Sequence, residues 1–306
     1  MTDEVASEEF QEVAARFADL WAAITCEGRE PRRPDIRPML INQVRAALDR
    51  GTAALDPCPT TIIANSFIVE GQVHAAATTS VLRLRHRDLF TLHALKTLAS
   101  DSSYDPAAQQ RLLREAEIGM ELRHPHCLAT QMVLRLDDGR PAMLMEWAES
   151  TLAARLNGTA LSVGDVGRIM SSVFSGLDAI HRAGLIHCDI SPANLLFAGE
   201  NATVLRIADF GIALRLGERH ADLDLALAAQ PQFASPEQRA GAVLDGRSDL
   251  FACGRLMAVL LDHCDGDDSG RLRGLSETLC REKLEDRPDN ARQAGLTLDT
   301  LLVEMD

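Results

Sequence analysis

Two acidic side chains and one amide stand close together in the second half of the chain, in two short segments. Asp189 and Asn194 lie five residues apart within residues 187–196, and Asp209 lies within residues 207–211. Carboxylates, an amide and a lysine are the parts that phosphoryl transfer requires, because this reaction depends on positioning and on neutralising phosphate charge more than on covalent help. The plainer alternative is that Asp189 and Asn194 only cap a turn.

The strings that contain these residues resemble protein kinase motifs. Residues 187–196 (HCDISPANLL) resemble the catalytic loop H-R-D-x-x-x-x-N, and residues 207–211 (IADFG) resemble the metal-binding D-F-G. The likeness continues through residues 233–238 (FASPEQ, like A-P-E), 248–254 (SDLFACG) and 286–288 (DRP). Five such strings in the family's order are hard to reach by chance. The resemblance extends over roughly residues 62–300.

The resemblance implies a role for each matching side chain in the large lobe, with ATP and Mg²⁺ as cofactors. Asp189 would accept the proton of the substrate hydroxyl, and Asn194 would hold a second magnesium ion. Asp209 would bind the ion that bridges the β- and γ-phosphates. Ser191 stands where the family usually has a lysine, so one contact to the γ-phosphate is lost.

A lysine and a glutamate complete the implied set in the small lobe. The string LHALK ends at Lys96 and resembles V-A-I-K, which would place this ammonium over the α- and β-phosphates. Its partner should be a helical glutamate. Glu115 matches the family's distance to the His124-Pro125 stop, and Glu117 remains the alternative.

The nucleotide's adenine would lie against a hinge after residue 144. Met145 would be the gatekeeper, with the backbone of Glu146 and Ala148 bonding the base. The other residues that the resemblance assigns to nucleotide binding are Gly71, Val81, Ala94 and Leu196. The Gly-rich loop is the clearest departure, because residues 70–79 contain one glycine where the family has three. We therefore expect weakened ATP affinity or an unusual loop conformation.

The activation segment lacks its usual regulatory residues. Cys188 replaces the arginine that in the family pairs with a phosphate in this segment, and residues 212–234 contain no Ser, Thr or Tyr. We expect the segment to be held by a partner or by packing of its leucines, which are Leu214, Leu216, Leu223, Leu225 and Leu227. Cys188 is expected to be a small buried residue, with a redox role as the alternative. Gln230 stands at the substrate-facing threonine.

Two further features concern the large lobe. Glu237 and Arg287 should form an ion pair that ties the activation segment to the lobe. The stretch from Asp249 to Arg287 is short for the family and contains an acidic loop, residues 262–268, so the helix that many kinases use for docking should be reduced or absent.

Periodicity predicts the elements that position these residues. Strands are expected at 67–69, 81–85, 89–95, 130–136 and 141–147, with a helix over 106–123. A stripe from Val166 to Ile180 indicates a long buried helix that stops at Gly184. The predicted fold is α+β and bilobal, with a β-rich N-lobe (61–147), a helical C-lobe (148–306) and a helical N-terminal extension (1–60).

The extension shows two helical patterns. Residues 8–25 carry an apolar stripe (Phe10, Val13, Phe17, Leu20, Trp21 and Ile24), and a second pattern contains Met39, Leu40, Val44 and Leu48. An apolar stripe of this kind must be buried against something. A hairpin that packs on the main domain for stability is the first interpretation. A docking element for a regulatory partner is the second.

Composition bounds the partners and the compartment. A net charge of −14 and a pI near 5.1 argue against nucleic acid or an anionic membrane and suit a basic protein substrate. Seven cysteines without a C-x-x-C pair, no signal peptide and no apolar run of membrane-spanning length predict a cytoplasmic protein, with delivery into another cell left open.

We therefore predict an ATP- and Mg²⁺-dependent Ser/Thr protein kinase of bacterial type that needs no activation-loop phosphorylation. The alternative is a pseudokinase that binds nucleotide as a scaffold or regulatory module. A small-molecule kinase is a third possibility, which the A-P-E-like string at residues 233–238 disfavours.

Overall fold

The structure is a computed structural model that describes most of the chain. The described residues are 2–28, 30–34, 36–38, 40–41, 44–45, 48, 61–158, 160–199, 202–223, 230–264 and 270–304. The chain divides into two compact units, residues 1–69 with 86–89 and residues 70–85 with 90–306. The predicted domain boundaries after residues 60 and 147 remain predictions. Within the described ranges, every helix falls short of the length and apolar character that a membrane span requires.

The first unit contains the predicted helices of the extension. α1 (Thr2–Thr25) leads into a short antiparallel pair, β1 (Cys26–Glu27) with β2 (Glu30–Pro31). Residues 36–38, 40–41, 44–45 and 48 are helical, while Met39 lies outside the described residues. β3 (Ile62–Ile63) pairs with the first residues of β4.

The expected burial of the α1 stripe is wrong for four of its side chains. Val13, Phe17, Leu20 and Trp21 are 65%, 63%, 36% and 50% exposed, and Ile24 is buried. The chain folds back on α1 near its C-terminal end, where Arg32 donates to the backbone oxygens of Ala23 and Thr25 at 3.1 and 2.8 Å, and this is the end at which Ile24 lies. The side chain of Phe10 lies outside the described residues.

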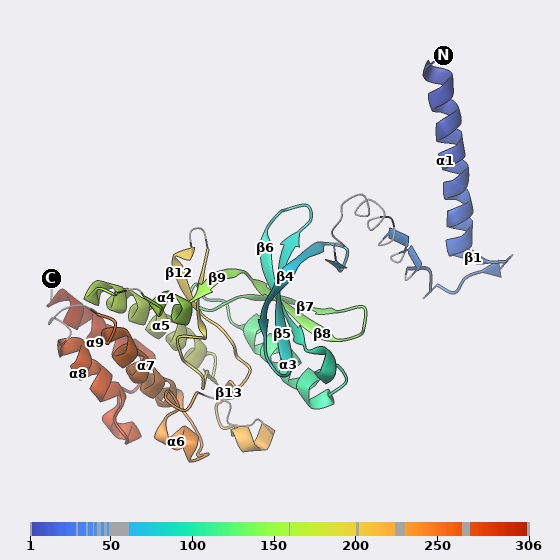
Figure 1. The fold of residues 1–306 in the computed structure, drawn as a ribbon. Helices are drawn as coiled ribbons and strands as arrows, with labels where there is room; N and C mark the ends of the chain where they lie inside the picture. Colours follow the sequence, from blue (N-terminus) through green and yellow to red (C-terminus); the bar gives the residue numbers. More distant parts are fainter. Residues whose placement is uncertain are drawn as a thin grey trace. The chain divides into compact units, whose positions relative to one another are not determined.

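The N-lobe of the second unit is an antiparallel sheet covered by one helix (Figure 1). The strands lie in the order β4 (Phe67–Ala75, with residues 70–75 in this unit), β5 (Thr79–His86, with residues 79–85 in this unit), β6 (Leu92–Leu98), β8 (Pro141–Glu146) and β7 (Thr130–Arg135). η1 (Ser100–Ser102) and α3 (Pro106–Glu121) follow β6. α3 begins at Pro106, and the Asp105 side chain accepts a hydrogen bond from the Ala107 N–H at 3.0 Å, which caps the helix.

Two strand boundaries differ from the sequence prediction. β4 continues to Ala75, well past residue 69, and β6 starts at Leu92 instead of residue 89. Phe90 has a left-handed backbone with φ of +58° and is exposed, so an extended strand cannot pass through it. The predicted helix over 106–123 and the two strands that follow it are confirmed within a few residues.

The C-lobe is mainly helical. It contains α4 (Leu152–Leu156), α5 (Val163–Arg182), α6 (Pro236–Arg239), α7 (Gly246–Leu261), α8 (Gly270–Leu279) and α9 (Ala291–Val303), with the short η3 (His220–Leu223) and η5 (Leu284–Asp286). Its strands are β9 (Ala148–Thr151), β11 (Leu195–Ala198) and β12 (Val204–Ile207) in one sheet, and β10 (Leu185–Ile186) with β13 (Leu214–Arg215) in another. The described residues between α7 and α8, 262–264, contain no helix.

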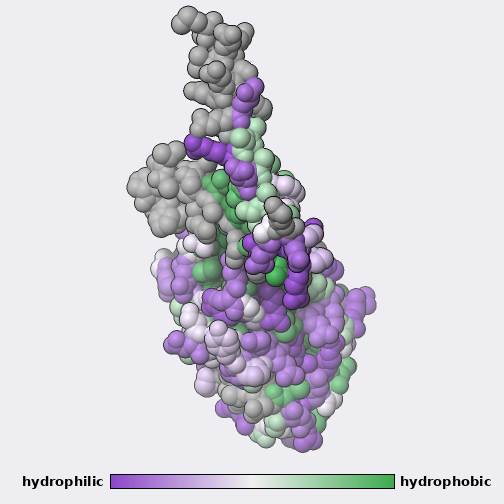
Figure 2. All heavy atoms as spheres, turned by 90° about the vertical axis from the view of Figure 1, so that its right-hand side faces the viewer, coloured by the Kyte–Doolittle hydropathy of each residue, from purple (hydrophilic) through white to green (hydrophobic). Residues whose placement is uncertain are grey.

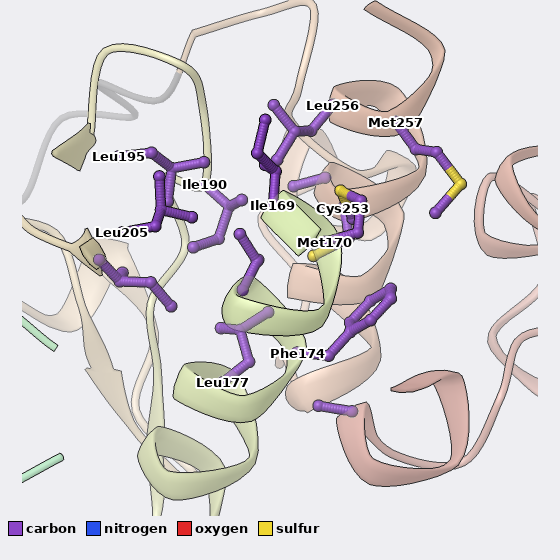
Figure 3. Packing of buried hydrophobic residues seen from close by; sticks show 14 of the residues in the cluster. Ile169, Met170, Phe174, Leu177, Ile190, Leu195, Leu205, Cys253, Leu256 and Met257 are labelled. Atoms are coloured by element: carbon purple, nitrogen blue, oxygen red, sulfur yellow. The ribbon is translucent and has the colours of Figure 1, made fainter. Parts of the chain in front are cut away.

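The core of the C-lobe forms around α5, as the sequence predicts. Met170, Phe174 and Leu177 point from this helix toward α7 and toward the strands that flank the catalytic loop (Figure 3). Ser162 and Asp165 form a capping box at the start of α5. Gly184, just beyond its end, has a φ of +74°, which fits the predicted stop. The face in Figure 2, by contrast, is mostly hydrophilic over its described surface.

Candidate active site

The lysine and two carboxylates that the sequence singles out meet in the second unit. The Lys96 Nζ lies 2.7 Å from Oε1 of Glu115 and 3.3 Å from Oδ1 of Asp209. Glu117, the alternative partner, is exposed on α3. Lys96 therefore links the N-lobe sheet, the α3 helix and the segment after β12.

Strand register explains why Lys96 faces α3. Lys96 is paired with Val81 on β5 and with Met143 on β8. Directly paired residues of antiparallel strands share a face of the sheet. On that face Met143 packs with Leu98 and with Ala108, Leu112 and Ala116 of α3. Glu115, also on α3 and buried, is thereby held beside the ammonium.

Burial has the largest influence on the pKa of each member of this group. It would lower the pKa of Lys96, but Glu115 and Asp209 outweigh it, so the pKa is raised and the side chain stays cationic. Burial raises the pKa of Glu115 to about 7 against the opposing effect of Lys96. For Asp209, Lys96 and the Gly211 N–H outweigh burial and lower the pKa. The carboxylate of Asp209 is thus kept ionised.

Asp189 and Asn194 are in direct contact in the catalytic loop. The Asn194 side-chain N–H donates to Oδ2 of Asp189 at 2.7 Å and to its backbone oxygen at 2.9 Å. The Asp189 N–H donates to Nδ1 of His187 at 3.2 Å, and Nε2 of His187 lies 3.1 Å from the Ala208 oxygen. Burial raises the pKa of Asp189. These bonds fix the carboxylate relative to the segment that carries Asp209.

Hydrogen bonds to Asp249 of α7 hold the backbone before Asp189 in place. Cys188 has a left-handed φ of +67°, which is costly for a residue with a Cβ. Asp249, which is buried on α7, accepts the Cys188 N–H at 2.8 Å and the His187 N–H at 2.9 Å. The Gln238 side chain donates to the Cys188 oxygen at 2.8 Å. These bonds hold the unusual conformation.

The side chain of Cys188 supports the interpretation of a small buried residue. It lies in a cluster with Ile186, Leu214 and Leu244, and burial raises the pKa of its thiol. A thiol in this state is not a reactive thiolate, so nothing here supports the redox alternative.

The leucines predicted to hold the activation segment differ from one another in burial. Leu214 is buried, and Leu223 packs against the same cluster as Cys188. Leu216 is 60% exposed, so the prediction is wrong for this residue. The reason is that β13 ends at Arg215, so the Leu216 side chain lies beyond the paired strand, although its N–H still donates to the Gly184 oxygen at 2.9 Å. Leu225 and Leu227 lie outside the described residues.

Ion pairs hold this segment to α3, which sequence reasoning missed. Arg114 of α3 lies 2.5 Å from Oε2 of Glu218 and donates to the Ala213 oxygen at 3.2 Å. Arg215 makes two hydrogen bonds to the carboxylate of Glu121, at 3.1 and 2.7 Å. We call these two pairs the α3 clamp. In the sequence, Arg114 stands out because it lies directly beside Glu115. No sequence pattern identifies Glu218 as its partner.

Ser191 and Gln230, two of the departures from the kinase pattern, are in contact. The Gln230 side-chain nitrogen lies 3.2 Å from Oγ of Ser191, and the Gln230 backbone nitrogen lies 3.5 Å from Oδ1 of Asp189.

The predicted pair of Glu237 and Arg287 is also formed, with Nη1 and Nη2 of Arg287 bound to the two carboxylate oxygens of Glu237. That prediction is confirmed.

A cavity of about 420 Å³ opens on the charged group. Lys96, Glu115, Asp189 and Asp209 line it, together with Thr78, Thr79, Leu98, Ala108, Arg111, Leu112, Gly211 and Ile212. Apart from Lys96, the residues predicted to bind the nucleotide do not line it. They are Gly71, Val81, Ala94, Met145, Glu146, Ala148 and Leu196.

Three of the residues predicted for nucleotide binding, Val81, Ala94 and Met145, lie on the face of the sheet that carries Lys96. Ala94 of β6 pairs with Met145 of β8, and Val81 of β5 pairs with Lys96, so these side chains share the sheet face described above. The Glu146 N–H donates to the Ala129 oxygen at 3.0 Å. In the loop that should cover the phosphates, residues 72–78 are exposed, and a Cβ added at Gly71 would meet nothing within 4 Å.

The oxygen donors of the site are of the kind that magnesium prefers. In the described residues there is no group of three or more His, Cys, Asp or Glu side chains that could hold a metal ion alone. Asp209 offers a carboxylate, and Asn194, whose amide nitrogen is engaged by Asp189, offers its amide oxygen. Magnesium prefers such oxygen ligands and completes its shell with water and phosphate oxygens. The residues therefore fit Mg²⁺ held jointly with a nucleotide.

Comparisons with known proteins agree with this geometry. A family model described as "Protein kinase domain" matches residues 70–265. "Serine/threonine-protein kinase PknJ" of Mycobacterium tuberculosis is 34% identical over 203 residues, which are 64% of this chain and 33% of PknJ. A probable serine/threonine-protein kinase of Streptomyces coelicolor, SCO3848, is 34% identical over 180 residues, 55% of this chain and 26% of that protein. The chain thus matches about a third or less of these relatives' length.

Among solved structures, the kinase domain of PknI from Mycobacterium tuberculosis is similar to this chain. It has a TM-score of 0.61 and 24% identity, covering 79% of this chain and 98% of the PknI domain. At this identity the likeness establishes the fold, and it confirms the predicted α+β bilobal fold class.

Proposed function

This chain belongs to the protein kinase domain family, and from this premise we propose that it transfers the γ-phosphoryl group of ATP to Ser or Thr hydroxyls of a protein. One observation carries the proposal. Lys96, Glu115 and Asp209 meet within hydrogen-bonding distance beside Asp189, and all four line one cavity. Residues that are distant in the chain thereby present the charges that phosphoryl transfer requires.

Each residue has a defined task in the proposed reaction. Lys96, kept cationic by Glu115, binds the α- and β-phosphates. Asp189 accepts the proton of the substrate hydroxyl, and Asn194 and His187 hold its carboxylate and backbone in place. Asp209 and Asn194 would hold magnesium. When bound, this metal neutralises charge on the β- and γ-phosphates.

We further propose that the activation segment needs no phosphate. The carboxylate of Glu218 already receives the guanidinium of Arg114, and Arg215 binds Glu121. A carboxylate supplies the anion that a phosphorylated side chain would otherwise bring to such an arginine. The α3 clamp thus holds Glu115 next to Lys96 without a modification.

A pseudokinase is the second candidate function, and the single glycine in residues 70–79 is the observation that favours it. The exposed residues 72–78 offer few close backbone contacts for phosphate. Such a protein would bind nucleotide without turnover and act as a scaffold.

We also propose a protein substrate, a regulatory partner and a cytoplasmic location for the chain. The excess of acidic residues favours a basic protein substrate over nucleic acid or an anionic membrane. Exposed Phe17 and Trp21 on α1 support a regulatory partner for the extension. We keep a cytoplasmic location as a prediction from cysteine usage.

The proposed function is tested by incubating the purified chain with Mg-ATP and a basic protein acceptor. Phosphate incorporation is measured by intact mass beside Asp189→Ala and Asp209→Asn, with the exposed Asp299→Asn as a control. We expect transfer by the wild type and the control only. Nucleotide-dependent thermal stabilisation without transfer would favour the pseudokinase, and transfer by Asp189→Ala would reject Asp189 as the base.

A further inference from the structure

We propose that Gln230 contacts the γ-phosphate and supplies from the activation segment the hydrogen-bond donor that is missing at Ser191. The inference rests on the proposed function, because it concerns the same phosphoryl group. It starts from the contact between the side chains of Gln230 and Ser191, which lie 39 residues apart in the sequence.

The position of the Gln230 amide is set by Ser191. Ser191 is fully buried beside Asp189, and its Oγ lies 3.2 Å from the Gln230 side-chain nitrogen. A primary amide carries two N–H donors, and a serine hydroxyl can donate or accept. In either orientation of the amide, at least one N–H is not used by Ser191. Gln230 is only partly buried, and although it does not line the 420 Å³ cavity, its backbone nitrogen lies 3.5 Å from Oδ1 of Asp189, which does.

The Gln230 backbone is fixed on both sides. Its N–H faces Oδ1 of Asp189 at 3.5 Å, and its oxygen accepts the N–H groups of Phe233 and Ala234 at 2.9 and 3.2 Å. Phe233 is buried, and Arg255 donates to the neighbouring Gln232 oxygen at 3.0 Å. The side chain therefore starts from an anchored turn beside the proposed base, where the γ-phosphate must lie during transfer to a hydroxyl bound to Asp189.

The charge balance of the site makes an added donor useful to the γ-phosphate. Asp189 and Asp209 are anionic and repel a phosphoryl group, and the lysine that would offset this repulsion is replaced by Ser191. A neutral amide donates a hydrogen bond to a phosphoryl oxygen and, unlike a cation, does not neutralise the carboxylate of Asp189. This carboxylate must stay ionised to act as a base.

The test compares three substitutions that differ in donor capacity. Gln230→Lys keeps a donor, Gln230→Ala removes it, and the nearly isosteric Gln230→Glu replaces it with a repelling carboxylate. A hydrogen bond to a charged group predicts a kcat about ten-fold or more lower for Gln230→Ala, a larger loss for Gln230→Glu and the smallest change for Gln230→Lys. A purely structural role would follow side-chain shape, so Gln230→Glu would then be the mildest.

A second measurement needs no turnover and separates this inference from the proposed function. The dissociation constants of Mg-ATP and Mg-ADP are measured by calorimetry for each variant. We expect Gln230→Ala to lose affinity for ATP and to keep its affinity for ADP, which also shows that the variant is folded. The exposed Gln232→Ala serves as the matched control and should behave as the wild type.

Two results would overturn the proposal. One is equal loss of ATP and ADP affinity in Gln230→Ala. The other is a kcat that does not fall in Gln230→Ala: an unchanged kcat would mean that the side chain makes no contact in transfer, and a raised kcat would mean that Gln230 blocks the base. If the wild type transfers no phosphate, the proposed function fails, and the comparison of ATP with ADP still decides whether Gln230 touches the γ-phosphate.

Discussion

Arg287 and Glu237 form a two-point ion pair inside the C-lobe, with nitrogen-to-oxygen distances of 2.7 and 3.0 Å. The Arg287 side chain is fully buried, and it also donates to the backbone oxygens of Arg247, Arg281 and Glu282. The pair joins the end of the activation segment, at α6, to the start of α7 and to the chain before α9. It fixes the segment that carries Gln230.

Removing one partner of this pair should be strongly destabilising. Arg287→Ala leaves a largely buried carboxylate without its cation, so we expect the free energy of unfolding to fall by about 3–5 kcal/mol. Urea unfolding followed by circular dichroism measures this change. The exposed pair of Arg271 and Glu304 provides the control, because Arg271→Ala should cost less than about 1 kcal/mol. Similar losses in both variants would contradict the argument from burial.

The same pair predicts how stability depends on pH. Burial would raise the pKa of Glu237, but hydrogen bonds from Arg287 and the Ser248 hydroxyl outweigh it and lower the pKa from 4.5 to about 2. A lowered pKa in the folded state stabilises the protein above the unfolded value of 4.5, and this contribution is lost as the pH falls toward 2. Urea titrations across this range should show less acid sensitivity for Glu237→Gln, with Glu304→Gln as the exposed control.

Glu115 and Glu117 should respond differently to the same substitution. Glu115→Gln removes the charge that holds Lys96, so we expect a fall in kcat/KM of about ten-fold or more. Glu117→Gln, on the exposed face of the same helix, should leave activity unchanged. Steady-state kinetics with varied ATP measures both. Loss of activity in Glu117→Gln alone would reverse the assignment.

The α3 clamp should show energetic coupling between its partners. Arg114→Ala and Glu218→Gln are each expected to lower activity, and the double variant should lose little more than either single one, because both remove one interaction. A charge swap, Arg114→Glu with Glu218→Arg, should recover part of the activity. The exposed neighbour Arg219→Ala is the control. Additive losses in the double variant would show that the two residues act independently.

Much of the active site could be predicted from the sequence because the key residues lie in short strings. The spacing between Asp189 and Asn194 is local, so the same string that identifies them also determines that they meet. The long amphipathic helix at α5 is likewise visible, since its apolar residues repeat with the period of a helix and must face a core.

The tertiary structure alone decided which residues meet across long distances. Both Glu115 and Glu117 are helical glutamates, and the packing of Leu112 and Ala116 on the sheet turns the first toward Lys96 and leaves the second in solvent. Arg114 contacts Glu218, and Ser191 contacts Gln230. In each case the sequence pattern of one segment does not predict the other segment as its partner. Periodicity reports which face of one element is buried, whereas the choice of partner depends on how separate elements pack, which no single segment encodes.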